Sequence, residues 1–177
     1  EQYFNEYFEK PFKKLWIDNF PLPNPWYSKN GVWINVDYNS FKLFHLSVIF
    51  RAGVSTLPTF QEVFLGPHEQ KIRSLIRNYN PGKSWQYPIM GYAVFHEKNY
   101  KLIQMVSKTE HVRFEGQHCY GIMYGGVMWR ILVSSERNYK FEENGLQPDG
   151  SMLFIGIPRT EIAVIQEASY ALKYPSS

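Results

Sequence analysis

Apolar residues recur at three- and four-residue spacing through much of the first half of the chain, a pattern typical of helices with one buried face. This spacing predicts helical structure over residues 1–20, with a kink or break at Pro11. It predicts a second helix that is capped by Asn39 or Ser40 and ends near Ala52. Because this second helix is apolar on nearly every face, we expect it to be buried.

A further helix is predicted to begin at Gly66-Pro67 and to end at Pro81-Gly82. Proline suits the first helical position, and Glu69 falls in the first turn, where the helix dipole favours a carboxylate. The side that would face the core carries Ile72, Leu75, Ile76 and Tyr79.

Beyond Tyr87 the helical spacing gives way to short apolar runs between turn residues, which is typical of strands. The predicted strands are 32–36, between the first and second helices, and then 89–96, 100–106, 111–115, 120–124, 127–134 and 152–157. We expect a polar loop over 138–150 and a closing helix over 160–172. Helices gathered mostly before the strands indicate an α+β fold, with N-terminal helices packed on a mainly antiparallel sheet and a C-terminal helix.

Composition supports one folded domain over residues 1–177, with a mainly helical half (1–88) and a mainly strand half (89–177) that includes the closing helix. Only 20% of the 177 residues are charged, and the chain has 5 Trp, 13 Tyr and 13 Phe. So many rings exclude a disordered tail or linker, because a solvated segment has few aromatic residues.

The single cysteine, Cys119, excludes an intramolecular disulfide and a cysteine-rich zinc site. No run of 18 apolar residues is present, so the sequence predicts no membrane partner and a cytoplasmic location. The sequence begins at Glu1 without a methionine, inside a segment with helical spacing, which predicts that a further part of the protein precedes it.

The net charge of +3 resides in the first half, because residues 89–177 hold as many acidic as basic residues. A basic cluster with no acidic residue among its members is formed by Lys71, Arg73, Arg77 and Lys83. With Trp85 as a stacking residue, this cluster predicts nucleic-acid binding. The alternatives are a solvated helix face and an aromatic ring that belongs to the core.

Two polar residues stand in the most apolar predicted helix, His45 and Arg51. A buried guanidinium needs a partner, so we expect a structural ion pair between Arg51 and Glu69, with Asp37 and Glu62 as other candidates. His45 is expected to be a core histidine whose ring nitrogens are satisfied.

Alternate residues of a strand share one side, so His111, Arg113 and Glu115 are candidate catalytic residues of a metal-dependent hydrolase. The same arrangement is equally typical of a charge-paired solvent face. The spacing of His96, His111 and His118 matches no metal-binding pattern, so no metal site and no cofactor are predicted in this chain.

Two linked motifs carry a family resemblance: Val36-Asp37-Tyr38-x-x-Phe41-Lys42-Leu43-Phe44-x-Leu46-Ser47-x-x-x-Arg51-Ala52-x-x-Ser55, and then Val63-x-Leu65-Gly66-Pro67-x-Glu69-x-x-x-Arg73. They resemble the middle portion of a bacterial family that opens with a short cysteine- and histidine-bearing module, similar to an HNH endonuclease or a zinc-finger treble clef. The resemblance implies that this chain is the scaffold and recognition part of a nuclease-like protein, as in genome defence. A divalent metal or zinc and the endonuclease activity would then belong to the upstream module. No His-Asn-His arrangement and no Cys-x-x-Cys pair occurs here, so none of that module's residues carries over.

Three hypotheses follow. The first is a nucleic-acid-binding or scaffold domain of an HNH-like protein. The second is a protein interaction module in which the aromatic helix within residues 1–20 packs on a partner or on a second copy of the chain. The third is a metal-dependent hydrolase in its own right.

Overall fold

A computed structural model describes residues 32–96 and 109–158, together with Glu6, Glu9, Lys10, Lys13 and Thr160. The predicted strand 100–106, the aromatic segment 1–20 apart from the four residues named, and the closing helix apart from Thr160 lie outside the described residues.

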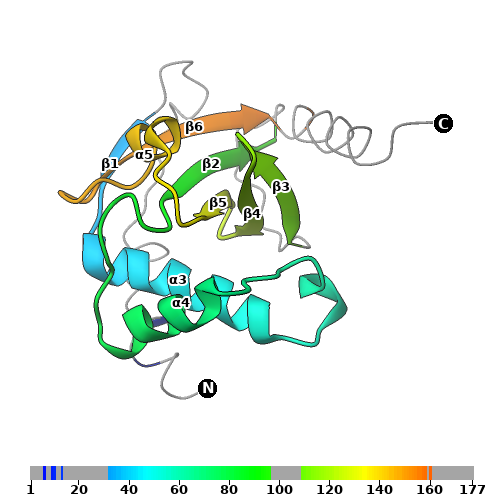
Figure 1. The fold of residues 1–177 in the computed structure, drawn as a ribbon. Helices are drawn as coiled ribbons and strands as arrows, with labels where there is room; N and C mark the ends of the chain where they lie inside the picture. Colours follow the sequence, from blue (N-terminus) through cyan, green and yellow to red (C-terminus); the bar gives the residue numbers. More distant parts are fainter. Residues whose placement is uncertain are drawn as a thin grey trace.

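The chain has an α+β fold, as the sequence predicts (Figure 1). In chain order the described elements are β1 (Val32–Asn35), α3 (Tyr38–Val54), a short 3-10 helix η3 (Pro58–Phe60), α4 (His68–Arg77), β2 (Ile89–Phe95), β3 (Glu110–Phe114), β4 (Gln117–Tyr124), β5 (Val127–Val133), α5 (Tyr139–Glu143) and β6 (Ser151–Pro158).

One six-stranded sheet holds these strands in the order β1-β6-β2-β5-β4-β3. Its neighbouring strands are antiparallel except for β2 and β6, which run parallel, with Gly91 opposite Phe154. The β3, β4 and β5 strands follow one another as hairpins, which is why the sequence shows short apolar runs with turns between them.

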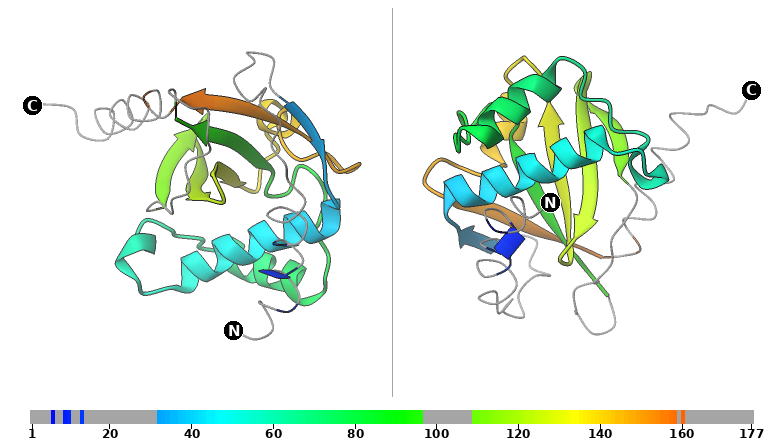
Figure 2. Two further views of the ribbon diagram at one scale, coloured as in Figure 1. Left: turned by 180° about the vertical axis from the view of Figure 1, so that it is seen from behind. Right: turned by 90° about the horizontal axis from the view of Figure 1, so that it is seen from below.

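The long helix α3 covers one face of the sheet, and α4 lies beside it, as the view from below in Figure 2 shows. Its N-cap is Asp37, whose carboxylate accepts the Ser40 N–H at 2.8 Å, and not Asn39 or Ser40 as the sequence suggested. Phe41 packs edge-on against Trp129 of β5 in the core between α3 and the sheet. The expectation of a buried helix is confirmed, because most side chains of α3 between Phe41 and Ala52 are buried.

The opposite face of the sheet carries α5, within the range where the sequence predicts only a polar loop. Asn138 caps this short helix by accepting the Phe141 N–H at 3.0 Å. The Phe141 ring then packs against Cys119 and Leu132, so one apolar residue among polar neighbours is enough to seat α5 on the sheet. None of the helices in the described ranges is long and apolar enough to cross a membrane.

Candidate functional site

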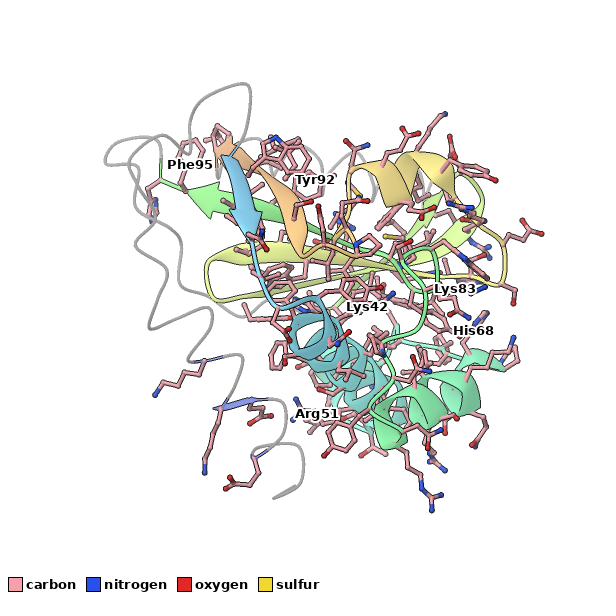
Figure 3. All side chains as sticks on the ribbon, turned by 90° about the vertical axis from the view of Figure 1, so that its left-hand side faces the viewer. Lys42, Arg51, His68, Lys83, Tyr92 and Phe95 are labelled. Atoms are coloured by element: carbon pink, nitrogen blue, oxygen red, sulfur yellow. The ribbon has the colours of Figure 1, made fainter. Side chains whose placement is uncertain are left out.

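A fully buried lysine lies between α3 and the segment that precedes β2 (Figure 3). Lys42 is 1% exposed, and its Nζ donates hydrogen bonds to the Lys83 carbonyl oxygen at 2.5 Å and to the Tyr38 Oη at 3.0 Å. The Tyr38 hydroxyl in turn donates to the Gly82 carbonyl oxygen at 3.3 Å. Two side chains of α3 therefore hold two consecutive carbonyl groups of this segment.

The same segment is also held from α5 on its other side. Ser84 Oγ donates to Glu142 Oε1 at 2.7 Å, and Arg137 Nε donates to Glu142 Oε2 at the same distance. We refer to Tyr38, Lys42, Ser84 and Glu142 as the lysine cluster. It connects α3 to α5 through residues 82–84.

Burial dominates the electrostatics of the lysine cluster. It lowers the pKa of Lys42 to about 7, against a smaller opposing effect of the Glu142 carboxylate. Burial also raises the pKa of Tyr38 to about 12, with Glu142 acting in the same direction. Lys42 is therefore only partly protonated at neutral pH.

A second polar cluster lies where β3 and β4 meet the beginning of α4. His111 Nε2 is 2.7 Å from His118 Nδ1, and the two rings are stacked with centroids 4.9 Å apart. On the other side, the His111 ring stacks against Tyr120 with centroids 5.1 Å apart. The strand register explains this, because His111 lies opposite Tyr120 while Arg113 lies opposite His118.

The third histidine of this cluster, His68, is the first residue of α4. Its Nδ1 is 3.1 Å from the Tyr87 hydroxyl, which orients the ring. The Tyr120 hydroxyl donates to the Phe64 carbonyl oxygen at 2.8 Å and so ties the segment leading into α4 to the sheet. We refer to His68, His111 and His118, with Tyr87, as the histidine cluster; its three imidazoles are half-buried.

Two cations act on the histidine cluster. Burial lowers the pKa of His68, and the charges of Lys71 and then His118 lower it further. Burial likewise lowers the pKa of His118, and the Arg113 guanidinium adds to the effect. The imidazoles of His68 and His118 are therefore mainly neutral at pH 7, beside a lysine and an arginine.

The structure separates the predicted trio of His111, Arg113 and Glu115. The first two lie on β3 next to His118, whereas Glu115 follows the strand in a turn with φ of 47°. Its carboxylate accepts a hydrogen bond from Asn138 Nδ2 at 3.1 Å and pairs with Lys140. Glu115 therefore attaches the β3–β4 turn to the region of α5, and its carboxylate does not join His111 and Arg113.

Of the predicted nucleic-acid-binding residues, Lys71, Arg77 and Lys83 are exposed. None of them takes part in a salt bridge between described residues. Arg73 differs, because it is 3.5 Å from Glu69 and its guanidinium lies over the Phe50 ring at 5.4 Å. Lys83 Nζ is 6.0 Å from the centroid of the Trp85 ring.

The predicted pair of Arg51 with Glu69 requires a correction. The carboxylate within contact of Arg51 Nη1 is that of Glu9, at 2.5 Å, while Glu69 faces Arg73 one turn further along α4. Glu69 and Arg73 occupy positions i and i+4 of one helix, so they are neighbours without any tertiary contact. His45 is fully buried, with Nδ1 2.7 Å from the Phe41 carbonyl oxygen, and burial lowers its pKa to about 3.

Elsewhere in the described ranges, neither metal binding nor thiolate chemistry is favoured. No group of three or more His, Cys, Asp or Glu residues among them is arranged to hold a metal ion. Cys119 is buried against Leu132 and Phe141, and burial raises the pKa of its thiol to about 11, so thiolate chemistry is disfavoured there.

Sequence reasoning missed Lys42 and His68. Lys42 had a signal, because it is a lysine within an otherwise apolar helix and such a residue must find hydrogen-bond acceptors. His68 had none, since nothing in its neighbourhood indicates that the start of α4 meets the β3–β4 hairpin.

Comparison with family models, with curated proteins and with solved structures finds no match for this chain.

Proposed function

We propose that this protein binds nucleic acid through a basic surface made of Lys71, Arg77, Lys83 and Trp85. The observation that carries the proposal is that these three cations are exposed and outside the salt bridges between described residues. Cations that are not already paired with carboxylates are available to contact phosphates and to release their counterions.

Other basic residues of the molecule provide the contrast. Arg130 pairs with Glu110, Arg137 with Glu142 and Lys140 with Glu115. These side chains connect parts of the fold, and their charge is already compensated. The basic residues of α4 and of the following segment are different, because Arg73 alone among them has a carboxylate neighbour in the described part of the chain.

Trp85 adds a second element of nucleic-acid recognition. Its ring is half-buried beside the exposed Lys83, an arrangement that combines a phosphate contact with a face on which a base can stack. The backbone beneath these two residues is fixed, because Lys42 holds the Lys83 carbonyl and Glu142 holds Ser84. A fixed backbone lowers the conformational entropy that binding would otherwise cost.

The test compares two double variants that each remove two positive charges. Neutralising both Lys71 and Arg77 to Gln should reduce the salt dependence of binding by about 1.5 in the log–log slope and weaken binding about 30-fold at about 0.1 M salt. The control double variant, Arg137→Gln with Lys140→Gln, changes net charge equally at residues that the fold already pairs. Fluorescence anisotropy with a labelled oligonucleotide measures both. Parent-like affinity and slope in the first variant would remove this surface from consideration.

The family assignment is the finer part of the hypothesis. The sequence motifs from Val36 to Arg73 support the proposal that this domain is the scaffold and recognition part of an HNH-like protein of genome defence. The interaction-module alternative depends on residues 1–20, which lie mainly outside the described residues.

A further inference from the structure

We propose that the histidine cluster cleaves single-stranded RNA without a metal ion, by transesterification in which the ribose 2′-hydroxyl is the nucleophile. The inference rests on the proposed function, because the basic surface would deliver the RNA. It adds an activity, a substrate class and roles for His68 and His118.

The two imidazoles come from different elements and are each oriented by a neighbour. His68 at the start of α4 uses Nδ1 toward the Tyr87 hydroxyl, which leaves Nε2 for a substrate. His118 on β4 uses Nδ1 toward His111 Nε2, which again leaves Nε2. A proton-transferring imidazole that is held by a second group is the arrangement that general acid–base catalysis requires.

The surroundings of these imidazoles favour a phosphodiester. Lys71 and Arg113 are both exposed. Arg113 lies opposite His118 on the neighbouring strand, and Lys71 follows His68 by three residues on α4, so each cation is a neighbour of one imidazole. Arg113 donates to the Gly116 carbonyl oxygen through Nη1 at 2.7 Å, so its position is defined while other guanidinium donors remain for a ligand. Two cations beside two proton-transfer groups can bind a phosphate and stabilise the charge that develops on it.

The reaction balances without any further reactant. The 2′-oxygen attacks phosphorus and forms a new P–O bond, while its proton passes to His68 Nε2. The bond from phosphorus to the 5′-oxygen breaks, and that oxygen takes a proton from protonated His118. The products are a 2′,3′-cyclic phosphate and a 5′-hydroxyl, and the two histidines return to their starting states by exchanging protons with water.

His111 acts as a positioning residue for the acid. Its Nε2 faces His118 Nδ1 directly, so a proton on this pair is shared between two nitrogens. Among the described residues, the cluster is faced by Lys71, Arg113, Tyr87, Tyr120 and Glu62, whose Oε2 accepts the His111 backbone N–H at 3.2 Å. Because burial, and to a smaller extent the neighbouring cations, lowers the pKa of both His68 and His118, the rate should be highest on the acid side of neutrality.

The experiment incubates the purified chain with a 5′-labelled single-stranded RNA in EDTA and resolves the products by denaturing electrophoresis and mass spectrometry. Fragments ending in a 2′,3′-cyclic phosphate are expected. His68→Gln and His118→Asn should each slow cleavage by at least about 100-fold. His96→Gln, a change of a histidine outside the cluster, should leave the rate unchanged and control for a co-purifying nuclease.

Binding is measured separately with a 2′-O-methyl RNA of the same sequence, which lacks the nucleophile. If this RNA is bound and the unmodified RNA stays intact, the inference is wrong while the proposed function stands. If neither RNA is bound or cleaved, both fail. Cleavage that persists in His68→Gln and His118→Asn, or that yields ends other than the cyclic phosphate, also overturns the inference.

Discussion

The lysine cluster and the histidine cluster use the same pairing, a tyrosine hydroxyl against a basic nitrogen, in opposite surroundings. Lys42 is 1% exposed, and its Nζ bonds to Tyr38 and to a backbone carbonyl. His68 pairs with Tyr87 in the same manner but is half-buried, beside exposed cations. The buried Lys42 amine can therefore only stabilise contacts within the fold, whereas the half-buried His68 imidazole can also contact a ligand from solution.

The described hydrogen-bond partners of Lys42 are a hydroxyl and a carbonyl oxygen, and neither carries a compensating charge. Burying a charged lysine among such partners is costly, and the lowered pKa of Lys42 reflects that cost. The fold retains the residue because its contacts, with those of Tyr38, attach residues 82–84 to α3. His68 and His118 are only half-buried, and their pKa values are lowered by burial with smaller contributions from neighbouring cations.

The largest effect should come from replacing Lys42 by Met. In the parent protein the folded state binds fewer protons than the unfolded state between about pH 7 and pH 10, because the pKa of Lys42 is lowered to about 7 on folding. The free energy of unfolding should therefore gain about 1.4 kcal/mol per pH unit from this residue, or about 4 kcal/mol over the interval. Urea denaturation at several pH values measures it.

Lys42→Met should abolish this gain with pH, whatever its effect at a single pH. Lys71→Met, a lysine exposed on α4, is the matched control and should keep the parent slope. A parent-like pH dependence in Lys42→Met would show that the buried amine does not carry the lowered pKa, and the contrast between the clusters would lose its basis.

A smaller effect is expected for Tyr38→Phe, which deletes one hydroxyl of the lysine cluster. The change removes the acceptor of a Lys42 hydrogen bond and the donor to the Gly82 carbonyl oxygen. Loss of these two bonds should lower the free energy of unfolding by about 2 kcal/mol. Tyr87→Phe, which removes the single contact to His68 Nδ1, should cost about half as much, because one hydrogen bond is lost and not two. Equal losses in the two variants would contradict this difference between the two clusters.

Within the described ranges the sequence predicted the α+β class, helices α3 and α4 and the strands, because helical spacing and short apolar runs report directly on which faces are buried. It did not predict α5, where a single apolar residue, Phe141, supplies the packing. Nor did it predict the parallel pairing of β2 with β6, since their separation along the chain leaves no local signal.

The candidate site was predictable only where its residues are neighbours in sequence or share a strand. His111 and Arg113 lie together as strand alternation requires, but Glu115 does not, because a turn with positive φ redirects its side chain. His68 joins them only because the segment leading into α4 is held on β4 by the Tyr120–Phe64 hydrogen bond, and no sequence pattern encodes that contact.

The smallest effect tests whether the histidine cluster is one electrostatic unit. Burial and Lys71 lower the pKa of His68 in any case, and the charge of His118 contributes a further decrease. His118→Asn removes this last contribution, so the pKa of His68 should rise slightly toward its ordinary value, which a titration of its ring resonances by NMR would detect. His96→Gln should leave the His68 titration unchanged, since His96 is not among the groups that shift it. If His118→Asn also left the pKa of His68 unchanged, His68 and His118 would be too far apart to act on one phosphate. The histidine cluster would then differ from the lysine cluster in burial alone.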